Sequence, residues 1–476
     1  MNKRMRKILT KLGVTIAVTV IASSAVLANE SDNKPKFSRW AVKEINDALS
    51  YGLINAQVIQ EDMRCPISEA KYMELCENVA KKIGEIPGTT KKGELTITMP
   101  ESGKVTKQNM LEMLHTILIN YEYSTDLGID ITNIASCMKA LEVVKGDGKS
   151  EGLEDTCTVE QAVLMSRRFV ESTYDLCDAD SEGLLWKVES DGNTVYLVGS
   201  IHIGKAGMYP IRDEIMEAYE SADEFYGEID FFGQESEEVQ AMKVYNDGTT
   251  VKDYLSEEYY EKLTQILKEY NITPEDLGNS KEWNIALTLP YLAVQGAEES
   301  EDLSENDTLG VDHLFAYHAL QDRKPIKALE TFEEHWGAFD IHMSQEVKTY
   351  KLESAIDEML ELDEQEKEDR NLMVESINYM QEEWKEGDVE TLNDIFVVSV
   401  NEETKKLPED KQKLEEEYNK ALIDDRDQIM ADSIDEALQS KEGKTYFIIA
   451  GLAHFVSDTG VLTRLEEKGY KVERIE

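Results

Sequence analysis

TVYLVGSIH, residues 194–202, and TYFIIAGLAH, residues 445–454, are the two stretches that decide the fold of this chain. Each is an apolar run of β-branched and aromatic residues that ends in Gly-x-x-His. Such runs predict buried strands, and the Gly is expected where the backbone turns out of the sheet. A His three residues past that Gly lies near the C-terminal end of its strand, where open α/β sheets place their functional sites. His202 and His454, two of only seven His residues, are therefore the first candidates for chemistry.

The domain around these two stretches is expected to span residues 184–476. The strong hairpin signal Asp191-Gly192 joins a strand at 185–189 to the first stretch. A long middle part, about residues 251–438, has helical periodicity and contains one short strand pattern at 324–330. The other predicted elements are a helix at 211–221, a strand at 224–229, a helix at 461–468 and a closing strand at 470–475. This pattern predicts an α/β domain whose two strand-bearing ends enclose a helical insert.

The charge of the chain excludes some classes of partner. The formal net charge is −47 over 476 residues, which would repel both nucleic acid and anionic membranes. We therefore expect no nucleic-acid partner. Most of the acidic residues are expected to form a solvated surface.

The first 28 residues have the pattern of a secretory signal peptide. Five Lys and Arg residues within the first 11 positions precede an uncharged apolar stretch from Leu12 to Leu27. Small residues before position 29 predict cleavage after Ala28, followed by a flexible lead over residues 29–36. The mature protein is then expected outside the cell or on its surface. An uncleaved N-terminal membrane anchor is the alternative.

The five cysteines do not predict a metal site. All lie in the first half of the mature chain, none forms a C-x-x-C pair, and their number is odd, so at least one thiol is unpaired or pairs between chains. Export would permit disulfides among them. They are Cys65, Cys76, Cys137, Cys157 and Cys177.

Residues 37–177 have a helical pattern interrupted by turns, and residues 178–183 form an acidic linker after it. The phrases at 40–41, 52–54 and 67–70, with a later copy at 137–170, resemble S-layer homology repeats. Family members that hold cell-wall polysaccharide commonly carry an Arg at the helix start, in a Thr-Arg-Ala-Glu type motif. This chain has Ser68-Glu69 and Val159-Glu160 there, which predicts weak cell-wall association. A small all-α S-layer-homology-like domain and a plain helical spacer both remain open.

The second domain resembles the TraB/GumN family, which includes the Tiki proteases. A single Gly-x-x-His is weak evidence, whereas the ordered pair with carboxylates between is specific. The resemblance implies that family's fold, with a mixed central sheet, flanking helices and a helical insert. The matching phrases are those at residues 185–188, 196–204, 221–228, 310–312, 324–331, 383–388, 425–426 and 447–475.

The resemblance implies a metal site made of His202, Glu228 and His454, which would lie together across the sheet. Chemistry allows this set, because two neutral imidazoles and one carboxylate leave a coordination position open for water. A bound divalent metal ion would lower the pKa of that water toward neutrality. The cofactor we expect is therefore a divalent metal ion.

Three further residues at matching family positions are candidates for catalysis. Glu330, with Asp312 behind it, would move protons. The forked donors of Arg426 would suit a substrate carboxylate or a developing oxyanion. Structural alternatives stay open, because Glu228 could be a buried acid paired with Arg426 and Glu330 could brace a helix.

Some positions depart from the family pattern. His335 stands where many relatives carry Gln, and Asp427 stands where Asn commonly follows the Arg. These departures bear on substrate contacts more than on the metal site. The His residues outside the two motifs show no ligand spacing and are expected to be surface or packing residues: His115, His313, His318, His335 and His342.

These features predict an exported metal-dependent hydrolase, peptidase-like, acting on a peptide or another small extracellular substrate. The first alternative is a protein at the cell surface that binds or sequesters a pheromone-like peptide without cleaving it. The second is a structural component of the cell surface. No Gly-rich nucleotide-binding motif and no G-x-S-x-G motif occurs in the chain.

Overall fold

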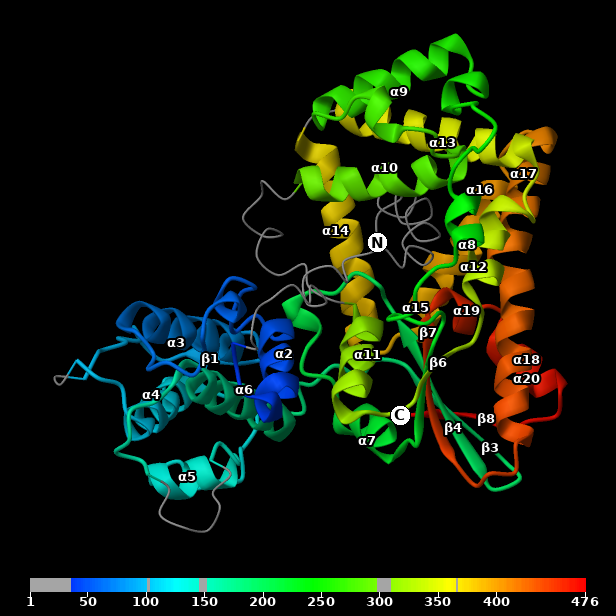
Figure 1. The fold of residues 1–476 in the computed structure, drawn as a ribbon. Helices are drawn as coiled ribbons and strands as arrows, with labels where there is room; N and C mark the ends of the chain where they lie inside the picture. The colour runs from blue at the N-terminus through cyan, green and yellow to red at the C-terminus, as the bar shows by residue number, and fades with distance from the viewer. Residues whose placement is uncertain (1–35, 101–102, 145–151, 298–309, 365–366) are drawn as a thin grey trace.

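The computed structural model describes residues 36–100, 103–144, 152–297, 310–364 and 367–476 (Figure 1). The predicted signal peptide or anchor, residues 1–28, lies outside the described residues, as does all but the last residue of the predicted flexible lead. Within the described ranges, no helix has both the length and the hydropathy that crossing a bilayer requires.

A six-stranded mixed sheet forms the centre of the second domain. Its order is β6-β5-β7-β4-β3-β8, with the first four strands parallel to one another and β3 antiparallel to both of its neighbours. The predicted mixed sheet is therefore confirmed. The strands are β3 (Leu185–Ser190), β4 (Asn193–Ser200), β5 (Glu224–Gly227), β6 (Ile326–Ala328), β7 (Thr445–Gly451) and β8 (Val472–Ile475).

The β3–β4 hairpin turns where the sequence predicts it. Asp191 and Gly192 have φ angles of 51° and 88°, and such a left-handed pair suits the twist of a two-residue hairpin. β4 begins at Asn193 and β7 begins at Thr445, so the two strands start 252 residues apart in sequence. They are nevertheless neighbours in the sheet, where Thr194 pairs with Thr445. The hairpin and this long-range pairing place both Gly-x-x-His segments at the centre of the sheet.

The two glycines of the repeated motif are offset by one position. In the β4–β7 register Gly199 pairs with Ala450, and Ser200 pairs with Gly451. The expectation that Gly199 marks the exit from the sheet is wrong, because β4 continues to Ser200. A Cβ at Gly199 would instead lie 2.8 Å from the Leu452 side chain, so close packing explains this glycine.

Helices cover both faces of the sheet and build a layer beyond one end of it (Figure 1). α7 and α11 contact one face, while α18 packs on β3 and β4 and carries α20 beside it. The helical insert contains α8, α9, α10, α13, α14, α16 and α17. The helices of this domain are α7 (Asp213–Ser221), α8 (Glu237–Met242), α9 (Glu257–Glu269), α10 (Glu282–Ala297), α11 (Val311–Asp322), α12 (Phe332–Asp340), α13 (Gln345–Glu364), α14 (Lys367–Lys385), α15 (Val389–Asn393), α16 (Ser399–Thr404), α17 (Glu409–Asn419), α18 (Asp425–Gln439), α19 (Ala453–Val456) and α20 (Val461–Glu467).

Short helical turns complete this domain. Two of them are π-helical and lie directly between regular helices, and the second of these, Lys420–Asp424, feeds straight into α18. Such π-turns inside helices are frequent at functional sites. The turns are η4 (Ala206–Met208), η5 (Val251–Asp253), η6 (Pro274–Leu277), η7 (Asp394–Val398) and η8 (Lys420–Asp424).

The N-terminal region is helical, as predicted, with one short strand pair added. Thr106 and Thr158 start its two central helices with capping boxes, which satisfy backbone N–H groups at the first turn. β1 pairs antiparallel with β2. The elements are η2 (Arg39–Ala41), α2 (Val42–Ser50), η3 (Val58–Gln60), α3 (Glu69–Gly84), β1 (Thr90–Lys91), α4 (Lys107–Ile119), β2 (Tyr121–Glu122), α5 (Ile134–Ala140) and α6 (Val159–Leu176).

One hydrophobic core runs through both regions. It includes Ile45 of α2 and Phe315 of α11, and α2 packs directly on α11. The predicted linker is itself packed, since Ser181 is buried and exchanges backbone hydrogen bonds with Pro210 and Arg212. A smaller core inside the helical insert is centred on Trp283 and Trp336.

Candidate metal centre

The four parallel strands each deliver a candidate residue to one edge of the sheet. His202 follows β4, Glu228 follows β5, Glu330 follows β6 and His454 lies in α19 directly after β7. Because the strands are parallel and adjacent, their C-terminal ends meet at this edge. Helices add four more side chains: Asp312 from α11, His335 from α12, and Arg426 and Asp427 from α18.

Asp312 holds the ring of His202. Nδ1 of His202 donates to Oδ2 of Asp312 at 2.7 Å, and both side chains are almost fully buried. Burial by itself would raise the pKa of Asp312, but the rings of His202 and His313 hold that pKa far below its ordinary value. The contact directs Nε2 of His202 toward Glu228, whose Oε1 lies 3.7 Å away.

Asp427 holds His454 in the same way. Nδ1 of His454 donates to Oδ1 of Asp427 at 2.6 Å, and both side chains are fully buried. Burial raises the pKa of Asp427, against the influence of His454. Nε2 of His454 is also buried and has no hydrogen-bond partner among the described residues.

His335 is a member of this site that the sequence did not single out. Its Nδ1 lies 2.8 Å from Oε1 of Glu330, and its Nε2 is buried without a hydrogen-bond partner in the part of the chain that the structure describes. The ring comes from α12, which starts at the capping box of Thr331 directly after Glu330. The sequence predicts a surface or packing residue here, because His335 shows no metal-ligand spacing.

Arg426 joins the two glutamates. Its Nη2 donates to Oε2 of Glu228 at 2.8 Å, and its Nε donates to Oε2 of Glu330 at 3.0 Å. The guanidinium is 1% exposed, and four of its hydrogen bonds go to these two carboxylates. It also contacts the backbone carbonyl of Leu422 and Nδ1 of His335. This contact matches the structural alternative, in which Glu228 is a buried acid paired with Arg426. The N–H donors of Arg426 point at protein groups.

The ion pair also determines the charge of Glu330. Burial would raise its pKa, but Arg426 and His335 lower it to about 2. A carboxylate with so low a pKa is a weak general base at neutral pH. Asp312 is held ionised in a similar way by its imidazole partners, so the contacts of both acids suit positioning better than proton transfer.

Glu228 connects the two halves of the site. Its Oε1 accepts a hydrogen bond from the backbone N–H of Gly451, and its Oε2 faces Arg426. Burial would raise the pKa of Glu228, whereas Arg426, His454 and His202 together lower it. Of the sequence-predicted trio, His202 places Nε2 3.7 Å from Glu228, and His454 lies near enough to influence the pKa of that carboxylate. The ligand-type atoms of the three residues do not all lie within 4.8 Å of one another.

A different trio forms the one compact group of ligand-type atoms found among the described residues. Glu228, Glu330 and His335 each place one such atom within 4.8 Å of the others. However, Nη2 of Arg426 lies 2.8 Å from Glu228 and 3.2 Å from Nδ1 of His335, so a guanidinium already supplies positive charge there. A metal ion in this compact group would have to compete with Arg426.

The site carries excess negative charge. Four carboxylates that are at most 2% exposed, those of Glu228, Asp312, Glu330 and Asp427, surround one guanidinium. Buried carboxylates that outnumber the cations beside them require further cations or protons for compensation. The donor set of imidazole nitrogen and carboxylate oxygen fits a transition metal ion or zinc.

The comparisons with known proteins identify a family for the second domain. The family model described as the TraB/PrgY/gumN family matches residues 184–474, more than half of the chain. Two curated proteins, the uncharacterized protein YbaP of Escherichia coli (strain K12) and that of Shigella flexneri, are each 25% identical over 138 residues.

Those 138 residues are 29% of this chain and 48% of each relative, so the chain spans about half the length of the curated relatives it matches. No solved structure matches the chain. The family match covers five strands of the central sheet in full, β8 up to Arg474, and all eight side chains of the site. The chain belongs to the TraB/PrgY/gumN family.

Proposed function

We propose that this protein is a metal-dependent hydrolase in which His202, Glu228 and His454 hold a divalent metal ion. The observation that carries the proposal is the pair of carboxylate–imidazole contacts, Asp312 to His202 and Asp427 to His454. Each fixes Nδ1 as the donor, which leaves Nε2 as the atom that can bind a metal. When bound, a divalent ion supplies a water with a lowered pKa as nucleophile.

The other side chains hold this arrangement. Arg426 orients Glu228 and Glu330 through its two donor edges, and the N–H of Gly451 orients the opposite oxygen of Glu228. Asp312 positions His202 rather than moving protons. These contacts preorganise the ligands, so little conformational entropy is lost when the cation binds.

His335 is our candidate for proton transfer in place of Glu330. Its Nδ1 is engaged by Glu330, so the unpartnered Nε2 is the nitrogen that can accept a proton. Burial and the nearby Arg426 lower the pKa of His335, which keeps the ring neutral near pH 7. Glu330 is held ionised in its ion pair and acts on the orientation of His335.

The substrate class and location follow from the sequence. We propose a peptide or another small extracellular substrate, on the basis of the resemblance to the Tiki branch. The signal-peptide pattern supports export, and the altered S-layer-homology-like motifs support no more than weak cell-wall association.

The experiment starts with metal analysis of the natively purified mature protein. A peptide panel is then incubated with the protein, with and without chelator, and cleavage is followed by mass spectrometry. We expect bound metal and chelator-sensitive cleavage, both lost in His202→Ala and His454→Ala. If both variants keep the metal content and the activity of the wild type, the proposal fails. His115→Ala, in the N-terminal region, is the control.

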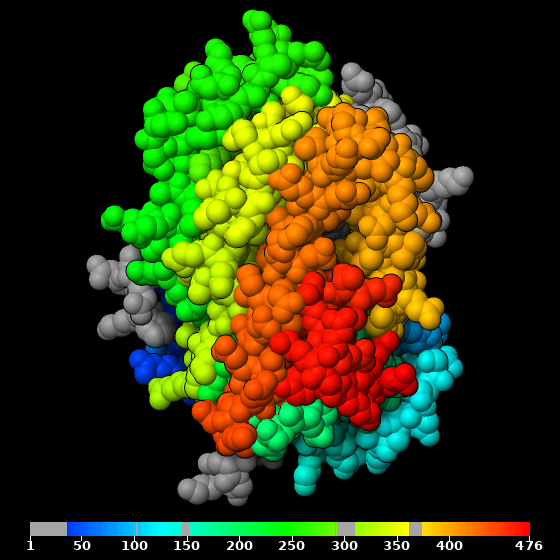
Figure 2. All heavy atoms as spheres, turned by 90° about the vertical axis from the view of Figure 1, so that its right-hand side faces the viewer, coloured from blue at the N-terminus to red at the C-terminus, as the bar shows by residue number. Residues whose placement is uncertain are grey.

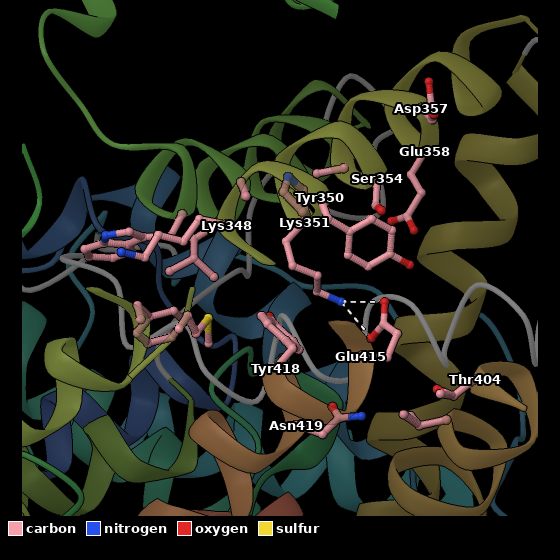
Figure 3. A pocket seen from close by; sticks show the side chains of 18 of the residues that line it. Lys348, Tyr350, Lys351, Ser354, Asp357, Glu358, Thr404, Glu415, Tyr418 and Asn419 are labelled. Atoms are coloured by element: carbon pink, nitrogen blue, oxygen red, sulfur yellow. Dashed lines mark hydrogen bonds and ion pairs between the residues drawn. The ribbon is translucent and has the colours of Figure 1, made fainter. Parts of the chain in front are cut away.

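A second candidate function is peptide binding without cleavage. A cavity of about 330 Å³ lies in the helical insert, between α10, α13 and α17, and aromatic side chains line it (Figure 3). Lys351 crosses it to pair with Glu415 at 3.0 Å and lies over the ring of Tyr418. The side chains of the metal centre, in contrast, are at most 3% exposed, so peptide hydrolysis there requires the centre to open.

The two candidate functions predict different products. A binding protein would retain intact peptide after gel filtration, and Tyr418→Ala would release it. A hydrolase would yield fragments whose formation depends on His454. Figure 2 shows the orange surface of the α18 segment next to the red surface of the C-terminal segment on one face of the molecule.

A further inference from the structure

Helix α11 connects the N-terminal region to the candidate site. Asp312 in its first turn holds His202, and His318 near its C-terminal end reaches into the N-terminal region. Nε2 of His318 lies 2.6 Å from Oδ1 of Asp47 in α2, and both side chains are at most 3% exposed. The same helix therefore contacts a metal-ligand candidate through one residue and α2 through another.

Asp47 is itself held from a third helix. Nη2 of Arg167 in α6 lies 2.9 Å from Oδ2 of Asp47. Burial would raise the pKa of Asp47, but His318 and Arg167 lower it, so the carboxylate is ionised. Asp47 thus joins α2, α6 and α11, and a buried carboxylate between two partners tolerates little displacement.

The loop after His202 receives a separate contact from the N-terminal region. Lys82 of α3 is 3% exposed and donates from Nζ to the backbone carbonyl of Ala206 at 2.7 Å. Ala206 is four residues beyond His202. Three residues further along, the ring of Tyr209 lies 6.4 Å from that of Tyr51, the residue directly after α2, centroid to centroid, in a stacked arrangement.

Burial of an ammonium group is costly unless its hydrogen bonds are satisfied. The contact of Lys82 with Glu85 is local to the end of α3, whereas its hydrogen bond to Ala206 exists only while α3 and the loop are packed together. The contact therefore restricts the loop that carries His202. The His454–Asp427 pair, by comparison, is built from α18 and α19.

We propose that the N-terminal helical region positions the His202–Asp312 half of the metal centre, with Asp47 and Lys82 as the positioning residues. This inference rests on the proposed function, since it concerns the same metal site. Asp47 acts on Asp312 through His318 and α11, and Lys82 acts on His202 through the loop at Ala206. The region is then a part of the site's scaffold in addition to any role outside it.

The test measures metal affinity of the full mature chain in Asp47→Asn and Lys82→Met. Affinity for Zn²⁺ and for Mn²⁺ is determined by competition with a chromophoric chelator at 10 °C. Circular dichroism and thermal midpoints without metal show whether each variant is folded. Lys71→Met is the matched control, because Lys71 lies on the same helix and pairs with Glu61 inside the N-terminal region.

We expect each positioning variant to bind metal about tenfold more weakly, in the range typical when groups behind metal ligands are removed. Lys71→Met should bind as the wild type does. Hydrogen–deuterium exchange should rise over residues 201–209 in Lys82→Met, with residues 445–451 unchanged. A merely structural role would lower the thermal midpoint without these two site-specific effects.

Two outcomes separate failure of this inference from failure of the function. Wild type that binds no metal overturns the proposed function, and this inference with it. Wild type that binds metal, with both positioning variants within twofold of it, overturns this inference alone. If Lys82→Met does not fold, Lys82→Arg keeps the charge but alters the reach, and unchanged affinity and exchange in that variant would likewise overturn the inference.

Discussion

The carboxylate of Asp427 accepts a hydrogen bond from Nδ1 of His454 at 2.6 Å. The adjacent residue, Arg426, faces the other way and binds Glu228 and Glu330. One turn of α18 therefore orients two predicted metal ligands, Glu228 directly after β5 and His454 in α19 after β7. The π-turn η8, which ends at Asp424, directly precedes both residues.

Substitution at Asp427 separates hydrogen bonding from charge. Asp427→Asn keeps an acceptor for His454 and should weaken metal binding by less than tenfold, whereas Asp427→Leu removes it and should weaken binding by about 10- to 100-fold. The measurement is Zn²⁺ affinity by chelator competition. Equal affinities in the two variants would contradict a role for this hydrogen bond.

Loss of Arg426 should strongly destabilise the fold. Arg426→Met leaves Glu228 and Glu330 buried without their cation and should cost roughly 3–5 kcal/mol of unfolding free energy. Urea denaturation at pH 7 measures this cost. Arg464→Met, on the partly exposed side of α20, is the control and should cost far less. Adding Glu330→Gln to Arg426→Met should recover part of the loss, because one uncompensated charge disappears.

Position 310 requires glycine because the backbone carbonyl of His202 leaves no room there for a Cβ atom. A Cβ there would lie 2.4 Å from that oxygen, so Gly310→Ala forces the His202 backbone to move. We expect a loss of about 1–3 kcal/mol in stability from this overpacking, together with weaker metal binding. Gly207→Ala is the control, since its nearest contact is the flexible Lys205 side chain at 3.5 Å. Equal behaviour of the two variants would contradict the packing argument.

Metal removal should lower thermal stability. A ligand that binds only the folded state at 100 times its Kd adds about 2.7 kcal/mol to the unfolding free energy. The thermal midpoint of metal-loaded protein should therefore fall on addition of a chelator. The chelator should leave the midpoint of His454→Ala unchanged, because that variant has lost a ligand. An identical shift in both proteins would point to metal bound elsewhere on the acidic surface.

The pH dependence of stability should show the influence of Asp180. Burial, followed by the charges of Asp175, Asp213 and Glu171, raises the pKa of Asp180 to about 8 from 3.8. Because the folded state binds this proton more tightly, the stabilisation is complete below pH 3.8 and disappears as the pH rises through about 8.

Asp180→Asn cannot ionise and should therefore be more stable than the wild type at pH 8.5, by roughly 1–2 kcal/mol after allowance for partial solvent exposure. The advantage should shrink as the pH falls toward 5. Urea midpoints at both pH values measure it, and Asp178→Asn, at an exposed neighbouring position, is the control. An advantage that does not change with pH would exclude this explanation.

Much of the sheet could be predicted from the sequence. The Asp191-Gly192 turn, the two apolar runs and the closing strand follow from local periodicity and turn chemistry, which depend on a few neighbouring residues. The edge that collects His202, Glu228, Glu330 and His454 also follows, once the strands are known to be parallel neighbours. These features determined the family and the candidate ligands.

Only the tertiary structure decided what each site residue contacts. Asp312 is 110 residues from His202, and Arg426 is 198 residues from Glu228. The one-residue offset between Gly199 and Gly451, the place of His335 in the site and the reach of Asp47 to His318 have no local signal in the chain. Local pattern predicts an element because its residues are neighbours in sequence, whereas these contacts depend on how separate elements pack around a common core.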